Sequence, residues 1–234
     1  MSKVYITGDV HCPNDVHKLN AGNFPEQRTM TRDDVVIVAG DFGLVWHDDK
    51  TYHHWLDWFA SRKYTLMWID GNHENHDWLA EFPVAERFGG QVHVIAHNVL
   101  HMMRGEVFTI NGKTWFAFGG AMSIDRHMRT PGQSWWPSEL PSVAECNHGM
   151  EVLDRVNWQV DHVVTHTAPG AVLDSMFPNY VRVTDPTERY LSAVHEQLKF
   201  KHWWFGHWHH DLDDIDKQGR FYTCLYDHVV SVDD

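Results

Sequence analysis

The sequence is poor in several features that define large classes of proteins. Its three cysteines, Cys12, Cys146 and Cys224, are too few and too scattered for a disulfide framework or a paired-cysteine zinc site. No apolar run approaches the roughly 20 residues that cross a bilayer, and residues 1–11 lack the apolar segment of a signal peptide. Basic residues are outnumbered, 19 Lys and Arg against 32 Asp and Glu, for a net charge of −13. These shortages argue against secreted disulfide-rich proteins, membrane proteins and generic binders of nucleic-acid backbones, so we expect a cytoplasmic location.

What the chain does contain is typical of a folded domain. Its 234 residues are 43% hydrophobic and 13% aromatic, enough to bury a sizeable core. Neither a repeat nor a long linker interrupts it, so we predict one domain over residues 1–234. Histidine is unusually abundant, at 20 residues. Because neutral imidazole is the most common metal ligand in proteins, the positions of these histidines matter most.

Short apolar runs recur along the chain, and five of them end in a turn of polar residues. These runs cover residues 4–6, 35–39, 66–69, 163–164 and 203–205. Continuous apolar runs of this length are typical of strands that are buried on both faces. Between them, helical spacing of apolar residues predicts helices over 52–62, 143–158 and 186–200.

Two hairpins are also predicted. Asn111 and Gly112 separate apolar runs at 106–110 and 113–119, and Gln218 and Gly219 form a weaker signal before residues 220–222. Strands joined by helices, together with hairpins, indicate an α/β protein in which mixed sheets are layered with helices. His93, His97 and His101 recur every fourth residue, but residues 91–95 alternate like a strand, which argues against a separate metal centre there.

The five polar turns carry a set of potential metal ligands. They present Asp9, His11, Asp41, Asn72, His73, His166, His207 and His209. This mixture of nitrogen and oxygen donors suits a transition metal, whereas Ca²⁺ would take oxygen almost throughout. The number of donors suggests two ions, with Asp41 placed to bridge them. In open α/β sheets, ligands bind beyond the carboxyl ends of strands, which is where these turns fall.

At these residues the sequence resembles the calcineurin-like metallophosphoesterases, whose blocks are D-x-H, G-D, G-N-H-[E/D], H and G-H-x-H. All five blocks occur in order, over residues 9–11, 40–41, 71–74, 166 and 206–209. The set is similar to that of class III cyclic-nucleotide phosphodiesterases, and residues 119–121 resemble small single-domain bacterial and phage members. The resemblance implies a four-layer α/β/β/α sandwich of two mixed β-sheets flanked by helices.

The resemblance also implies a role for each residue. One ion would be held by Asp9, His11, Asp41 and His209, and a second by Asp41, Asn72, His166 and His207. His73 would face the substrate as an acid or a stabiliser of phosphate oxygens, so Asp41 and His73 are the catalytic candidates. The expected cofactors are two divalent or trivalent transition-metal ions, with Mn²⁺ favoured and Fe, Zn, Ni or Co open.

The implied activity is hydrolysis of phosphate esters. Two ions would clamp the attacking and leaving oxygens of an in-line displacement, and a metal-bridging hydroxide would be expected to attack phosphorus. One departure concerns the second block, because residues 40–46 lack the acid and the arginine found in serine/threonine protein phosphatases. The acid that orients His73 is therefore missing or comes from elsewhere. Arg126 and Arg129 are the candidates for gripping phosphate.

Several alternatives stay open. The motifs fit a phosphodiesterase or a phosphatase acting on a small phosphate ester and do not decide between them. A protein phosphatase, a nuclease or a non-catalytic metal-binding scaffold are the alternatives; the net charge argues against nucleic acid as a partner. Neither the oligomeric state nor the physiological substrate follows from the sequence.

Overall fold

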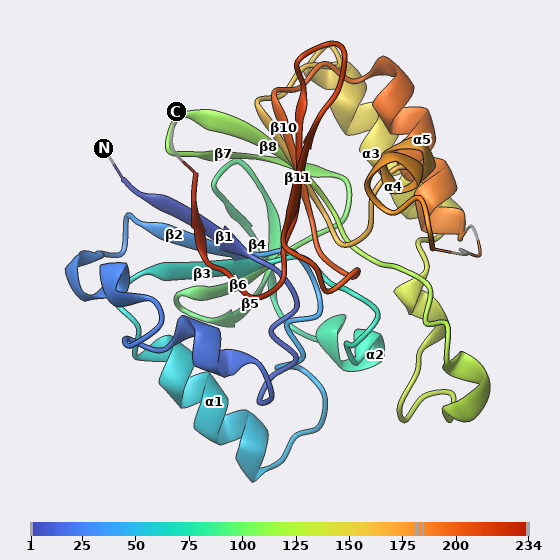
Figure 1. Cartoon of the computed structure of the whole chain (residues 1–234). Helices are drawn as coiled ribbons and strands as arrows, with labels where there is room; N and C mark the ends of the chain where they lie inside the picture. The colour runs from blue at the N-terminus through green and yellow to red at the C-terminus, as the bar shows by residue number, and fades with distance from the viewer. Residues whose placement is uncertain (1, 181–182, 184, 233–234) are drawn as a thin grey trace.

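Two β-sheets lie face to face, with helices on both outer sides (Figure 1). The computed structural model describes residues 2–180, 183 and 185–232. Helix α1 (Lys50–Ala60) covers one sheet, and helices α3 (Val143–Arg155), α4 (Gly170–Met176) and α5 (Pro186–Gln197) cover the other. The predicted four-layer α/β/β/α arrangement is confirmed.

The first sheet has seven strands in the order β13-β1-β2-β3-β6-β5-β4. Strands β1, β2, β3 and β6 are parallel, whereas β13, β5 and β4 pair antiparallel at the two margins. The bounds are β1 (Val4–Thr7), β2 (Val35–Val38), β3 (Thr65–Trp68), β4 (Val84–Arg87), β5 (Gly90–Ala96), β6 (Val99–Met102) and β13 (Val230–Ser231).

The second sheet has six strands in the order β11-β12-β10-β9-β8-β7. Its four central strands are parallel, and β11 and β7 are the antiparallel edges. The bounds are β7 (Glu106–Ile110), β8 (Lys113–Phe118), β9 (His162–Thr165), β10 (His202–Phe205), β11 (Leu212–Ile215) and β12 (Phe221–Cys224).

Alternating side chains of the buried strands explain the layers. In β2, Val35 and Ile37 pack between the two sheets with Trp115 and Trp204 of the second sheet, whereas Val36 and Val38 pack beneath α1. A third apolar cluster fills the space between the second sheet and α3, α4 and α5. Because both faces of the central strands are covered, each strand is a continuous apolar run in the sequence.

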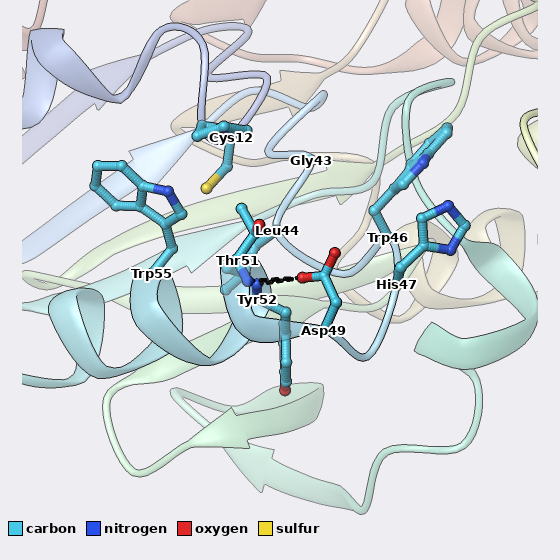
Figure 2. Close-up of a pocket in the computed structure, with 10 residues that line it drawn as sticks. Cys12, Gly43, Leu44, Trp46, His47, Asp49, Thr51, Tyr52 and Trp55 are labelled. Atoms are coloured by element: carbon cyan, nitrogen blue, oxygen red, sulfur yellow. Dashed lines mark hydrogen bonds between the residues drawn. The ribbon is translucent and has the colours of Figure 1, made fainter.

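Capping residues set the helix starts more sharply than apolar spacing does. Helix α1 begins at Lys50, two residues before the predicted start, because the Asp49 carboxylate accepts the backbone N–H groups of Thr51 and Tyr52 (Figure 2). Helices α3 and α5 begin at their predicted residues, behind the Ser142–Glu145 capping box and Asp185. The three helices end two to three residues earlier than predicted. A short helix, α2 (His76–Leu79), follows the third polar turn.

The hairpin predictions are confirmed. Asn111 and Gly112 have φ angles of 50° and 72°, which suit a tight turn between β7 and β8. Strands β11 and β12 form the second hairpin. His93 and His101 face each other across the antiparallel strands β5 and β6, as the alternating pattern indicated. Among the described residues, no helix is both long and apolar enough to span a membrane.

Candidate metal centre

The five polar turns meet at one edge of the sandwich. Those after β1, β2 and β3 belong to the first sheet, and those after β9 and β10 belong to the second. Backbone hydrogen bonds join the turns directly: His11 N–H donates to Asp41 O at 2.8 Å, and Gly206 N–H donates to His166 O at 2.9 Å. Side chains that are up to 200 residues apart in the chain therefore lie within a few ångströms of one another.

Asp41 lies at the middle of the cluster. Its Oδ2 is 3.3 Å from His11 Nε2, and its Oδ1 is 3.2 Å from His166 Nε2. The His73 backbone N–H donates to Oδ1 at 2.7 Å, and Asn72 Oδ1 is 3.2 Å from His166 Nε2. The buried carboxylate thus presents its two oxygens to two different groups of donors.

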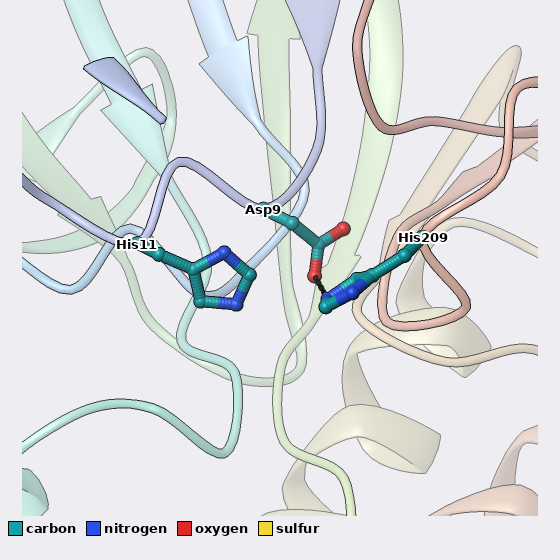
Figure 3. Close-up of side chains that lie close together, drawn as sticks. All are labelled: Asp9, His11 and His209. Atoms are coloured by element: carbon teal, nitrogen blue, oxygen red, sulfur yellow. Dashed lines mark ion pairs between the residues drawn. The ribbon is translucent and has the colours of Figure 1, made fainter. Parts of the chain in front are cut away.

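Asp9 and His209 complete one side of the cluster. His209 Nε2 is 3.6 Å from Asp9 Oδ1, and His11 faces the same space (Figure 3). The backbone N–H of His207 donates to Asp9 Oδ2 at 2.9 Å, and the ring of His207 is 5.0 Å from that of His166. Three overlapping groups have ligand atoms within 4.8 Å of one another: Asp9, His11 and His209; His11, Asp41 and His73; and Asp9, Asp41 and His166.

The backbone of these turns is held in an uncommon conformation. Five potential ligands have φ angles in the left-handed region: Asp9 (42°), His11 (40°), Asp41 (47°), His207 (70°) and His209 (50°). Non-glycine residues adopt such angles rarely, and clusters of them mark functional sites. The neighbouring glycines are required by space, because a Cβ at Gly71 would collide with Asp41 and one at Gly206 with Asp9.

A family model supports what this geometry indicates. Residues 2–211 match the model described as calcineurin-like phosphoesterase. The chain belongs to this family. It is therefore a metallophosphoesterase, a hydrolase of phosphoric esters, and the resemblance inferred from the five motif blocks is confirmed.

Solved structures show the same fold at low sequence identity. The phosphoesterase is 17% identical to a protein assigned as a 5′-nucleotidase of Staphylococcus aureus, solved in complex with α-ketoglutarate, with a TM-score of 0.53 over 98% of this chain and 50% of that one. It is 11% identical to GAP50, the anchor in the inner membrane complex of Plasmodium, with a TM-score of 0.53 over 96% of this chain and 71% of that one.

A third structure is the phosphopantetheinyl hydrolase of Mycobacterium tuberculosis, at 16% identity and a TM-score of 0.48 over 97% of this chain and 90% of that one. No curated protein sequence matches the chain.

The donor chemistry of the cluster fits the divalent metals that this family binds. Two buried carboxylates, four imidazoles and one amide oxygen converge, and neutral imidazole with carboxylate suits Mn, Fe, Co, Ni or Zn. The imidazoles are also oriented by partners on their outer nitrogens. His11 Nδ1 is 2.9 Å from Asp15 Oδ2, and His166 Nδ1 is 2.9 Å from Ala39 O. Such contacts turn the Nε2 atoms towards the metal space.

The charges in the cluster perturb its imidazoles in opposite directions. Burial by itself lowers the pKa of His11 and His166, but hydrogen bonds to Asp41 and its charge raise these pKa values to about 9 and about 10. Burial and the neighbouring His166 lower the pKa of His207 to about 4. The same interactions hold the pKa of Asp41 well below its usual range, against the effect of burial. The carboxylates of the cluster thus favour the protonated form of His11 and His166.

His73 lies at the edge of the cluster, beside Arg129. The Arg129 Nη atoms are 3.3 Å and 3.4 Å from the two ring nitrogens of His73, and Arg129 Nη2 is 2.8 Å from Asp125 Oδ2. Burial lowers the pKa of His73, and the charge of Arg129 adds to this effect. Within the described residues, no carboxylate forms a hydrogen bond with the His73 ring, which instead stacks at 6.4 Å on Trp46.

The two candidate arginines differ in position. Arg129 is partly buried and lines a cavity of about 530 Å³ that also contains Asp41, Asn72 and His73. Arg126 is exposed, in a 3-10 helix over Arg126–Met128, and is not among the residues that line this cavity. The structure therefore brings Arg129 to the cluster and leaves Arg126 outside it.

Sequence reasoning missed a buried lysine that supports the first turn. Lys18 Nζ donates to Gly8 O at 2.8 Å, to Asp9 O at 3.1 Å and to Tyr226 O. The ring of Tyr226 stacks on His209 at 4.6 Å. The contacts bridge 208 residues, so no local pattern in the sequence could have indicated them.

Asn72 is held by residues from the segment after β8. Its Nδ2 donates to Ser123 Oγ at 3.3 Å, and Ser123 Oγ donates to Glu139 Oε2 at 2.7 Å. Glu139 Oε1 also accepts the Ser123 backbone N–H at 2.8 Å. Because the amide nitrogen is engaged there, the Asn72 oxygen faces His166. Glu74 has a related supporting role, since its Oε1 accepts the Phe42 N–H in the second turn at 2.9 Å.

Cys12 follows a potential ligand but faces away from the cluster. Its sulfur points into a separate small cavity of about 130 Å³ beside Trp55 (Figure 2). Burial and the nearby Glu74 raise the pKa of its thiol to about 12. A thiol with this pKa is mostly protonated at neutral pH, and its direction keeps it away from the candidate ligands.

Proposed function

We propose that this phosphoesterase holds two transition-metal ions joined by Asp41 and hydrolyses phosphate esters of small molecules. The observation that carries the proposal is the position of Asp41, with Oδ2 towards His11 and Oδ1 towards His166. Asp9, His11 and His209 would hold one ion with Asp41. Asn72, His166 and His207 would hold the other. Mn²⁺ is the ion that we would supply first.

When bound, two such ions activate water and neutralise charge that develops on the phosphate oxygens. The remaining steps belong to side chains at the edge of the cluster. The ring of His73 has an N–H to donate to a phosphate oxygen or to the leaving oxygen, and its pKa is lowered by burial, with a smaller contribution from the charge of Arg129. The guanidinium of Arg129, anchored by Asp125, offers further donors to the substrate phosphate.

The net charge of −13 and the cavity of about 530 Å³ favour a small ester over a nucleic-acid strand. The first test removes all metal, restores Mn²⁺, and compares hydrolysis of bis-p-nitrophenyl phosphate with that of p-nitrophenyl phosphate. Preference for the diester would identify a phosphodiesterase, and preference for the monoester a phosphatase. Cleavage of neither ester while two ions stay bound would contradict the proposed activity and favour a scaffold.

Two variants separate the metal ligands from the residues that act on the substrate. We expect Asp41→Asn to lose metal, measured as bound Mn²⁺ per chain, and activity with it. We expect His73→Ala to keep its metal while kcat falls by roughly 10²- to 10⁴-fold, the range for losing a general acid. Loss of metal from His73→Ala would make His73 a ligand and contradict its proposed role.

The paired arginines test the phosphate contact. Arg129→Ala should weaken transition-state binding by roughly ten- to a hundredfold in kcat/KM, since hydrogen bonds to charged groups contribute about 1.5–3 kcal/mol. Arg126→Ala is the matched control, because this arginine is exposed and lies outside the cavity. Equal losses from both variants would refute a specific role for Arg129.

A further inference from the structure

The cavity at the metal centre is lined by two chemically different sets of side chains. The polar set consists of the candidate ligands Asp41, Asn72, His207 and His209, together with His73, Asp125, Arg129, Asp185 and Glu188. The apolar set, which we call the apolar wall, consists of Met122, Ile124, Tyr180, Val183 and Trp208. The candidate ligands and Arg129 suit a phosphate group, but a phosphate group gives the apolar wall no function.

The apolar wall is unusually exposed to water. Ile124 is 82% exposed, Val183 70% and Tyr180 54%. In the part of the chain that the structure describes, nine large hydrophobic side chains are exposed, and three of them line this one cavity. Scattered exposed apolar residues are ordinary, whereas a group of them at the mouth of a polar site indicates a surface that binds something apolar.

Aromatic contacts fix one side of the wall. Phe177 stacks on Trp208 at 5.0 Å with an interplanar angle of 19°, and on His210 at 5.6 Å. The Tyr180 hydroxyl is 2.9 Å from His210 Nε2, and Trp208 Nε1 donates to Thr167 Oγ1 at 3.3 Å. Because these rings hold one another, Trp208 and Tyr180 should lose little side-chain conformational entropy when a ligand binds.

Two aliphatic residues of the wall, Met122 and Ile124, come from the segment that also carries Arg129. The Met122 backbone N–H donates to Asp185 Oδ2 at 3.0 Å, which ties this segment to the start of α5. Ser123 is anchored to Glu139, so Ile124 follows a fixed residue and projects into water. The phosphate contact and the apolar contact therefore belong to one short stretch of chain, 122–129.

We propose that the apolar wall binds the face of a planar ring carried by the organic part of the phosphate ester, as in aryl esters and esters that carry a nucleobase. The inference rests on the proposed function, since the phosphate must first occupy the metal centre. Aromatic and aliphatic side chains together suit the two faces of a flat ring. A ring that removes about 60 Å² of apolar surface from water should improve binding roughly tenfold.

The test measures binding of phosphonates, whose carbon–phosphorus bond resists hydrolysis, to the Mn²⁺-loaded protein by calorimetry. Benzylphosphonate is compared with methylphosphonate, which has the same charged group and no ring. We expect the benzyl compound to bind roughly tenfold more tightly. Ile124→Ser should remove most of this difference and leave methylphosphonate binding unchanged. Ile215→Ser, an equally conservative change at an exposed isoleucine of β11, is the control and should change neither affinity.

The outcomes separate this inference from the proposed function. Equal binding of the two phosphonates, or a ring preference that survives in Ile124→Ser, overturns the inference and leaves the metal site intact. Binding of neither compound to the loaded protein overturns the proposed function as well. A nucleoside 5′-phosphonate then identifies the source of the ring: binding tighter than that of benzylphosphonate assigns the wall to nucleobases, and weaker binding to aryl groups.

Discussion

Two buried aspartates follow neighbouring parallel strands, but different groups balance the charges of their carboxylates. Asp41 follows β2 and Asp70 follows β3, and both carboxylates are surrounded by imidazoles. Arg104 contacts Asp70 Oδ2 through Nη2 at 2.5 Å and through Nε at 2.9 Å, while His101 Nε2 lies 3.2 Å from Oδ1. Within the described residues, no arginine or lysine side chain makes a salt bridge with Asp41.

The difference shows what distinguishes a structural cluster from a metal site. A permanent cation from the chain neutralises Asp70 and, despite burial, holds its pKa far below the usual range. The carboxylates of Asp41 and Asp9 contact imidazoles, which can give up their protons and leave the negative charge for an ion, and Lys18 donates to the backbone oxygen of Asp9 rather than to its carboxylate. None of the three groups that could hold a metal includes Asp70. In this protein, a buried arginine therefore distinguishes the Asp70 cluster from the Asp41 cluster.

Removing the internal cation should have the largest effect. Arg104→Met leaves Asp70 buried and unpaired, which is expected to lower the free energy of unfolding by about 3–5 kcal/mol. Urea denaturation of the metal-free protein measures this change in the free energy of unfolding. The double variant Asp70→Asn/Arg104→Met should recover part of the loss because no unpaired charge remains. A loss below 1 kcal/mol would show that Asp70 is neutralised by its histidines alone.

The metal cluster should respond to ions in a way that the Asp70 cluster does not. At a free Mn²⁺ concentration of ten times Kd, the free energy of unfolding of the wild type should rise by about 1.4 kcal/mol for each bound ion, or about 2.8 kcal/mol for two ions. Asp41→Asn should lose this gain, and Arg104→Met should keep it on a lower baseline. The comparison fails if Mn²⁺ stabilises Asp41→Asn as much as the wild type.

A smaller effect is expected where the metal cluster is supported from outside. Ser123→Ala removes the hydroxyl that holds the Asn72 amide, so Asn72 should turn its oxygen to the metal less consistently. We expect metal affinity to fall by roughly ten- to a hundredfold, measured by competition with a chelating dye. Ser175→Ala, at an exposed serine bonded to Asp214, is the matched control. Unchanged affinity in Ser123→Ala would assign the Ser123–Glu139 pair to loop stability only.

The smallest expected effect is on how the free energy of unfolding changes with pH. Burial lowers the pKa of His76, beside Asp70, to about 4, whereas an unfolded histidine titrates near 6.5. The unfolded chain therefore binds this proton first, so the contribution of His76 is fully present above about pH 6.5 and is lost as pH falls towards 4. Between pH 7 and 5.5 we expect wild-type stability to fall by about 1 kcal/mol more than that of His76→Gln. If the free energies of unfolding of the two proteins changed with pH in parallel, this prediction would be contradicted.

Sequence patterns predicted the part of the site that depends on short-range order. Each ligand turn follows an apolar strand, and glycine beside an acid or histidine marks where the strand ends, so Asp9, Asp41 and His207 could be named in advance. The edge where the turns meet followed from the parallel pairing of the strands. The α/β layers followed from the same runs.

Contacts between distant segments could not be predicted in this way. Asp70 and Asp41 have similar local sequences, and only the pairing of Asp70 with Arg104, 34 residues later, separates a charge that the chain neutralises from one that it leaves open. The same reason explains why Arg126 and Arg129 were equal candidates, since a 3-10 turn between them decides which one reaches His73.

The ligand turns come from both sheets, and this arrangement has a consequence for how the protein comes apart. An ion shared by Asp9 and His209 would link segments 200 residues apart, across the interface between the first and the second sheet. Separation of the two sheets would then require the ion to dissociate first. Metal should therefore lengthen the lifetime of the native state by slowing unfolding, and should protect the amide protons of β1 and β10 from exchange together. The ions proposed for hydrolysis would also hold the two sheets together.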